Sequence, residues 1–242
     1  MHSYTLAPMR EIVSGVYLLS GFPPAGFNVY LLRAGGENVL LDTSTRHSRR
    51  RILRQAPEKL DAIFITHAHR DHAGAMHAVA EATGAPVWAS ATDADAIEGK
   101  APEPIPAQHK NHVVNRLFSG WWRDPHPVAR RLADGEMVAG FEVIGFRGHT
   151  PGQIGLWRES DRTVICADTM RSMNLYTGLP QLGEMPEIFT CDVHEARRSI
   201  RKLAALEASA VCFGHGRPLT KDAAAKINAF AASLPPEEPT PP

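Results

Sequence analysis

Cysteine is scarce in this chain of 242 residues, and the three cysteines, Cys166, Cys191 and Cys212, lie far apart. An odd and scattered set implies no disulfide framework, so we expect a reducing compartment, the cytoplasm. An excess of charge of one sign is also missing, because 26 Lys and Arg residues balance 26 Asp and Glu residues. A chain without net charge carries no general electrostatic attraction for nucleic acid, so we expect no nucleic-acid partner.

Long apolar runs are absent as well. No stretch approaches the roughly 20 apolar residues that a membrane helix requires. The first fifteen residues lack the basic and apolar regions of a signal peptide. Apolar residues nevertheless make up 43% of the chain and charged residues 21%, which is typical of a globular protein with a substantial core. We therefore expect a small-molecule substrate and no membrane partner.

Short apolar runs separated by turn residues predict two groups of strands, each followed by helices. The strands are expected at residues 11–19, 27–34, 39–43, 60–66, 85–90, 129–136, 137–147, 154–160, 163–168 and 210–216. The helices are expected at residues 44–57, 72–84, 91–100, 193–209 and 219–234. This alternation predicts a single domain over residues 1–232, with sheets inside and helices outside.

Two segments depart from this pattern. Residues 101–127 contain five prolines and two adjacent tryptophans without clean periodicity, and we interpret them as a partly helical, lid-like insertion. Three histidines in this region, His109, His112 and His126, are interpreted as ordinary lid residues rather than ligands. Residues 233–242 are rich in proline and glutamate and are expected to form a disordered tail.

Metal-binding side chains are crowded into the stretch THAHRDHAG at residues 66–74. His67 and His69 directly follow a predicted strand and lie two residues apart, so an extended backbone points both to the same side. Asp71 and His72 follow as the chain turns into the next predicted helix. The alternative interpretation is that Asp71 caps the helix and that the histidines lie on the surface. Three histidines so close together favour the metal site over this alternative. The arrangement suits two metal ions side by side.

Ligands from elsewhere in the chain are needed, because zinc is usually four-coordinate. Three candidates each follow an apolar strand and have glycine or small residues beside them. They are His149 in GHTPGQ, Asp168 at the end of TVICAD, and His215 in FGHG. Taken singly, each of these three residues could instead be a helix cap or a turn residue.

These four motifs, in this order from about residue 12 to residue 220, resemble the signature of metallo-β-lactamase-fold hydrolases. The resemblance implies an α/β (α+β) fold, a four-layer αβ/βα sandwich of two mixed β-sheets packed face to face with helices outside. One metal ion would be held by His67, His69 and His149, and a second by Asp71, His72 and His215, with Asp168 bridging them. Asp42 would support these ligands through hydrogen bonds; its alternative is a turn residue that ends a strand.

The resemblance also implies the chemistry. Two divalent ions, zinc first with iron or manganese as alternatives, lower the pKa of bound water to about 7, so that a bridging hydroxide attacks the substrate. Asp71 is expected to accept a proton as well as to bind metal. The glyoxalase-II-like and lactonase-like branches favour a lactone or thioester substrate. A mononuclear iron persulfide dioxygenase, a β-lactamase-like amide hydrolase and a non-catalytic metal-binding protein stay open as alternatives.

An apolar substrate pocket is expected above the metals. Its walls are predicted to come from Phe22, Phe118, Trp121, Trp122, Met170 and Tyr176. For the tryptophan pair the alternatives are an anchor that packs the insertion onto the core and a homodimer contact.

Overall fold

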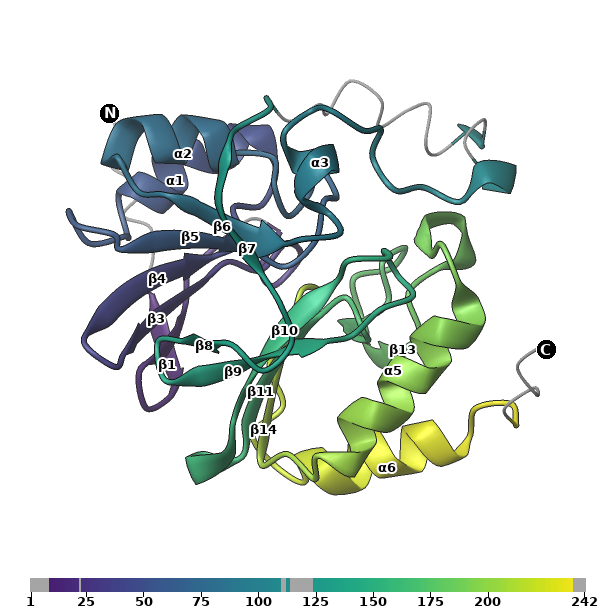
Figure 1. The fold of residues 1–242 in the computed structure, drawn as a ribbon. Helices are drawn as coiled ribbons and strands as arrows, with labels where there is room; N and C mark the ends of the chain where they lie inside the picture. Colours follow the sequence, from purple (N-terminus) through teal and green to yellow (C-terminus); the bar gives the residue numbers. More distant parts are fainter. Residues whose placement is uncertain (1–8, 22, 110–111, 114–123, 237–242) are drawn as a thin grey trace.

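Two β-sheets form the centre of the protein, and helices lie against their outer faces (Figure 1). The computed structural model describes residues 9–236 apart from residues 22, 110–111 and 114–123. The first sheet contains, in spatial order, β1 (Arg10–Val13), β2 (Val16–Leu18), β3 (Tyr30–Ala34), β4 (Glu37–Leu41), β5 (Ala62–Ile65), β6 (Val87–Ser90) and β7 (Val128–Leu132). The second contains β14 (Ala210–Phe213), β11 (Thr163–Ala167), β10 (Ile154–Arg158), β9 (Phe141–Gly145) and β8 (Met137–Val138).

The helices divide between the two sheets. The first sheet is covered by α1 (Arg49–Leu53), α2 (Met76–Thr83) and α3 (Ala94–Ile97), and the second by α5 (Val193–Ala205) and α6 (Ala223–Ala232) (Figure 1). Short 3₁₀ helices occupy Arg46–Ser48, Ala107–His109, Glu159–Asp161 and Glu187–Phe189. A separate hairpin pairs β12 (Arg171–Met173) with β13 (Pro180–Gly183).

Side chains of the central strands alternate between two apolar layers, which explains why a strand such as β5 is apolar throughout. In β5, Ile63 and Ile65 pack under the helices of the first sheet, whereas Phe64 packs between the two sheets. In β11, Ile165 joins the layer between the sheets and Val164 packs against α5 and α6. The predicted four-layer sandwich of two sheets with outer helices is thereby confirmed.

Several predicted boundaries are wrong, and the backbone shows why. Residues 11–19 are a hairpin of β1 and β2 rather than one strand, because Gly15 turns the chain with a φ of +74°. The helix predicted from residue 72 begins only at Met76, since the residues before it form a loop. In this loop the Gly74 N–H donates to the carbonyl oxygen of Ser44, which fixes the ligand-bearing segment against the turn after β4.

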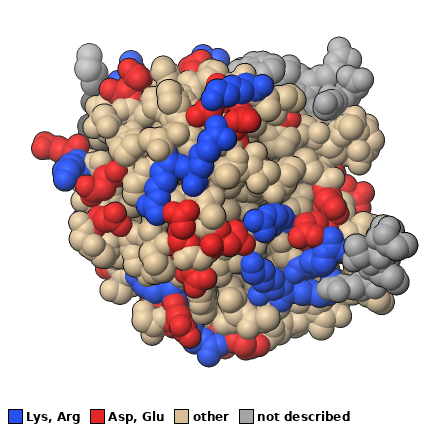
Figure 2. All heavy atoms as spheres, viewed as in Figure 1, with Lys and Arg blue, Asp and Glu red and all other residues tan. Residues whose placement is uncertain are grey.

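Charged side chains of both signs lie on the surface. Lys and Arg side chains lie interspersed with Asp and Glu side chains over the face seen in Figure 2. Within the described residues, no helix combines the length and the apolar character that crossing a membrane requires.

Strand direction brings four strand ends to one place. Strands β11 and β14 are parallel, and β9 runs the same way because both β9 and β11 are antiparallel to β10. The carboxyl ends of these three strands therefore lie along one edge of the second sheet. The loop that follows β5 meets this edge, since the Ile154 N–H donates to the Thr66 carbonyl oxygen at 3.0 Å.

Candidate metal centre

Seven polar side chains gather where β5, β9, β11 and β14 end. The loop after β5 carries His67, His69, Asp71 and His72; the loops after the other three strands carry His149, Asp168 and His215. Six of the seven are buried, and only the Asp71 side chain is partly exposed, at 24%. Asp71 is therefore the member of the cluster that solvent reaches.

The side chains form the two sets that the family resemblance implies. The candidate ligand atoms of His67, His69 and His149 lie within 4.8 Å of one another, and those of Asp71, His72 and His215 do the same.

Asp168 lies between the two sets. Its Oδ2 atom is 3.9 Å from Nε2 of His67 and 3.5 Å from Nε2 of His149. The same oxygen is 3.3 Å from Nε2 of His72 and 3.2 Å from Nε2 of His215. A single carboxylate oxygen thus faces imidazoles of both sets.

Hydrogen bonds behind the cluster fix the tautomers of His72 and His67. The Nδ1 atom of His72 lies 2.8 Å from Oδ2 of Asp42, a carboxylate that only accepts, so Nδ1 carries the hydrogen. The Thr66 hydroxyl donates its one hydrogen to Asp42 and therefore accepts from Nδ1 of His67 at 3.0 Å. Both histidines consequently direct Nε2 into the cluster.

Backbone carbonyls do the same for two further histidines. Nδ1 of His215 donates to the Gly26 carbonyl oxygen, which leaves Nε2 as the ligand atom. Nε2 of His69 donates to the Pro104 carbonyl oxygen at 2.9 Å, so His69 presents Nδ1 instead.

His149 completes the set of five imidazoles. The Thr190 hydroxyl donates to the Pro186 carbonyl oxygen and so accepts from Nδ1 of His149 at 3.4 Å. All five imidazoles thus have one nitrogen occupied behind the site and the other nitrogen directed into it, as metal-binding histidines do.

The lone pairs inside the cluster lack partners. The Nε2 atoms of His67, His72 and His149 and the Oδ1 atom of Asp168 are buried, and they find no hydrogen-bond partner among the described residues. Buried polar atoms of this kind are costly unless something satisfies them. Nitrogen and carboxylate donors that converge in this way fit divalent transition-metal ions.

The electrostatic environment inside the cluster shifts the pKa values of the histidines in opposite directions. Burial, together with the neighbouring His69, lowers the pKa of His149 to about 3. Burial also lowers the pKa of His215, but Asp168 and Asp71 outweigh it and raise that pKa to about 10. The pKa of His72 is likewise raised, because its carboxylate neighbours, Asp168 first, outweigh burial. Metal ions that bind here would therefore displace protons from His72 and His215.

Residues 24–215 match the family model of the metallo-beta-lactamase superfamily. The chain belongs to this superfamily. It is 31% identical to the probable metallo-hydrolase YflN of Bacillus subtilis (strain 168), with 80% of this chain and 81% of that protein covered. It is 27% identical to a hydroxyacylglutathione hydrolase of Cereibacter sphaeroides, with 85% and 66% covered. The crystal structure of TTHA1623 in a di-iron-bound form superposes with a TM-score of 0.62 at 27% identity, covering 86% of this chain and 96% of that one. The protein is accordingly a metal-binding hydrolase.

Asp93 is a supporting residue of this hydrolase that its motifs do not reveal. Its Oδ2 atom accepts hydrogen bonds from the Ala68 N–H at 2.9 Å and from the Thr150 hydroxyl at 2.8 Å. The carboxylate thus ties the loop after β5 to the loop that carries His149. The available signal is its position shortly after a predicted strand, because Asp42 and Asp168 also lie at strand ends.

Asn28 supports the His215 loop in a similar way. Its side-chain amide donates to the carbonyl oxygens of Phe213 at 2.8 Å and Gly216 at 2.7 Å, so it spans the residues on both sides of His215.

The insertion is fixed to the ligand loop where it begins. The Arg70 guanidinium pairs with the Glu103 carboxylate, and the Arg70 N–H donates to the same carboxylate at 3.0 Å. Both side chains are largely buried, at 13% and 8% exposed. Together with the bond from His69 to Pro104, this pair joins residues 103–104 to the metal centre.

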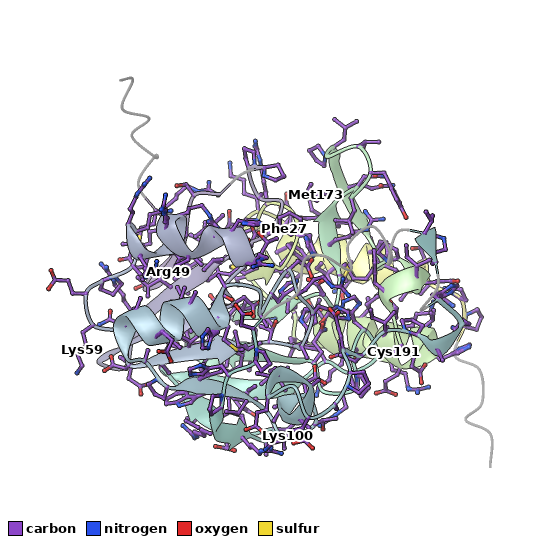
Figure 3. All side chains as sticks on the ribbon, turned by 90° about the horizontal axis from the view of Figure 1, so that it is seen from above. Phe27, Arg49, Lys59, Lys100, Met173 and Cys191 are labelled. Carbon is purple, nitrogen blue, oxygen red and sulfur yellow. The ribbon has the colours of Figure 1, made fainter. Side chains whose placement is uncertain are left out.

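Four of the six residues predicted to line the apolar pocket lie outside the described residues, and the prediction is wrong for the other two. Phe22, Phe118, Trp121 and Trp122 lie outside the described residues. Met170 follows a turn in which the Thr169 N–H donates to the Cys166 carbonyl oxygen, and its side chain is fully buried in the core beneath α5, so it lines no pocket. Tyr176 is 77% exposed on the β12–β13 hairpin, which carries Met173 and projects from the body of the protein in Figure 3. It therefore forms no wall of an enclosed pocket.

Replacing Asp42 by asparagine tests the support behind His72. Asparagine tolerates the φ of +60° at this position, so the change removes the charge and one acceptor with little backbone strain. We expect metal affinity, measured by competition with a chromophoric chelator, to fall about 10- to 100-fold. Asp61→Asn, a change at a carboxylate away from the centre, is the control, and unchanged affinity in Asp42→Asn would contradict the role of Asp42.

Gly214 tests how closely the centre is packed. A Cβ atom at this position would lie 2.0 Å from Oδ1 of Asp168 and 2.7 Å from Cε1 of His72. Gly214→Ala should therefore displace Asp168 and lower the metal content of the purified protein. The matched control is Gly36→Ala, where φ is +80° but no atom lies within 4 Å. It should lose about 1 kcal/mol of stability and keep its metal; equal metal content in both variants would refute the packing argument.

Proposed function

We propose that this hydrolase uses a dinuclear zinc centre to cleave a small ester-like substrate, a lactone or a thioester. The position of Asp168 is the observation that carries this proposal, because one oxygen of Asp168 lies 3.2–3.9 Å from imidazole nitrogens of both ligand sets. Seven donors would be enough to hold two ions, with His67, His69 and His149 for one, Asp71, His72 and His215 for the other and Asp168 for both, and would leave a position for water, as in catalytic zinc sites. Zinc is favoured by the imidazole-rich donor set, and iron is the second candidate because TTHA1623 holds two iron ions.

Two divalent ions, when bound, supply a water molecule ionised near pH 7 and a Lewis acid for the substrate carbonyl. The protein contributes orientation, since the hydrogen bonds behind the five imidazoles hold each ring with one nitrogen directed into the site. Asp71 is the partly exposed member of the centre. Burial raises the pKa of its carboxyl, but His72 and His215 outweigh burial and hold that pKa below the usual range. Asp71 is therefore ionised at neutral pH and positioned to accept a proton at the edge that substrate reaches.

The substrate class follows from the relatives and from the charges around the centre. The hydroxyacylglutathione hydrolase of Cereibacter sphaeroides supports ester-like chemistry, but the chain covers only 66% of that enzyme. Arg70, in the ligand loop, is already neutralised by Glu103, so it offers little attraction to a carboxylate on the substrate. An uncharged lactone or a short thioester fits these features better than a polyanionic substrate. The three cysteines are free thiols, which fits action in the reducing cytoplasm.

Substitution of the two acidic ligands tests the proposed function. Asp71→Ala and Asp168→Ala should each lose the second metal ion and lower kcat/KM by at least about 100-fold. Zinc per chain is measured by elemental analysis, and activity on a panel of lactones, thioesters and β-lactams. Asp222→Asn is the matched control, because that side chain is 79% exposed and the new residue keeps its shape. Normal activity in either alanine variant would contradict the two-metal mechanism. Oxygen uptake with persulfides, without hydrolysis of any substrate of the panel, would favour a persulfide dioxygenase instead.

A further inference from the structure

A second cluster of metal-binding side chains lies outside the seven residues of the centre. His77 and Glu81 are four residues apart on α2 and so share one face of the helix. His126 comes from the segment that leads into β7, which runs close to α2 (Figure 1). The candidate ligand atoms of these three residues lie within 4.8 Å of one another.

The two imidazoles already have the separation of zinc ligands. Their Nδ1 atoms are 3.2 Å apart and their ring centroids 5.4 Å apart. Two nitrogens that bind one tetrahedral zinc ion at 2.0–2.1 Å are about 3.3 Å apart. The carboxylate of Glu81, on the exposed side of the helix, supplies a third donor and leaves a fourth position for water.

Neighbouring residues hold His126 in this position. Its N–H donates to the Ile97 carbonyl oxygen at 3.4 Å, and the Val128 N–H donates to Oε1 of Glu98 at 3.1 Å. Pro125 packs against Gly99, where a Cβ atom would lie 2.8 Å from the proline ring. A donor held in place by its own backbone loses little freedom when it binds an ion.

The protonation state agrees with this geometry. Burial and the neighbouring His77 lower the pKa of His126, and Glu81 opposes them only in part. The His126 imidazole is therefore neutral at physiological pH, which is the form that binds metal.

We propose that His77, Glu81 and His126 form an outer zinc site that ties the end of residues 101–127 to α2. This site is separate from the proposed catalytic centre and shares no ligand with it. The beginning of the same segment is fixed to the ligand loop by Glu103 and Pro104. An ion in the outer site would fix its other end, and so hold both ends of the segment onto the first half of the fold.

Zinc binding at equilibrium tests the outer site. The full chain and its variants are dialysed against excess Zn²⁺, and bound zinc per chain is measured by elemental analysis. His77→Asn and His126→Asn should each bind one ion fewer than the unmodified protein. His194→Asn, at an exposed histidine of α5, is the control and should bind as many ions as the unmodified protein. The difference between proteins decides the result, so it does not depend on how many ions the catalytic centre holds.

Thermal melting gives a second readout, because an ion that binds only the folded state raises its Tm. Added Zn²⁺ should raise the Tm of the unmodified protein and of His194→Asn by more than that of His77→Asn. Glu81→Gln, a change on the exposed helix face that leaves the fold intact, should weaken the outer ion while hydrolytic activity stays unchanged. Equal zinc content in the unmodified protein, His77→Asn and Glu81→Gln would overturn the proposal and leave a simple hydrogen bond between the two histidines.

Discussion

The burial of the Asp168 carboxylate is the constraint on which the rest of the centre depends. This group lies at the end of β11 with 2% of its side chain exposed, and a buried charge is costly unless opposite charges or ligands surround it. Four imidazole nitrogens lie within 4 Å of one of its oxygens. Burial raises the pKa of Asp168, but His215 and His72 outweigh it and hold that pKa well below the usual range. The loops after β5, β9 and β14 must therefore converge on the end of β11.

A second ring of polar groups makes that convergence specific. Asp93 joins the loop after β5 to the loop that carries His149. Asp42 ties the loop after β5 to the end of β4, and Asn28 ties the His215 loop to the segment before β3. The bond of Asp42 places a hydrogen on Nδ1 of His72, and the bonds of Asp93 and Asn28 fix the loops that carry His149 and His215. Because these contacts lie behind the ligands, they exist before any ion binds, and the protein meets its metals with a preformed site.

The sequence was most informative where chemistry and strand pattern coincide. Each predicted ligand follows an apolar strand, and strand direction is enough to bring His149, Asp168 and His215 to one edge of the second sheet. His67 reaches the same edge because the two sheets pack face to face and the loop after β5 bonds to β10. The direction of a side chain after a turn is not encoded in this way, which is why the sequence pattern places Met170 in a pocket although the residue packs in the core. The hairpin at residues 11–19 escaped prediction because its apolar residues continue across the turn at Gly15. The hydrogen bonds of Asp93 join loops that are distant in the sequence, so the spacing of residues within one motif does not predict them.

Asp168 lies between the two ligand sets, where it would bridge two metal ions. Anomalous diffraction at the zinc edge, from crystals of protein purified without added metal or chelator, measures this directly. Two peaks about 3.5–4 Å apart on either side of the Asp168 carboxylate are the predicted result. A single peak held by one ligand set alone, or no peak at the seven residues, would contradict it.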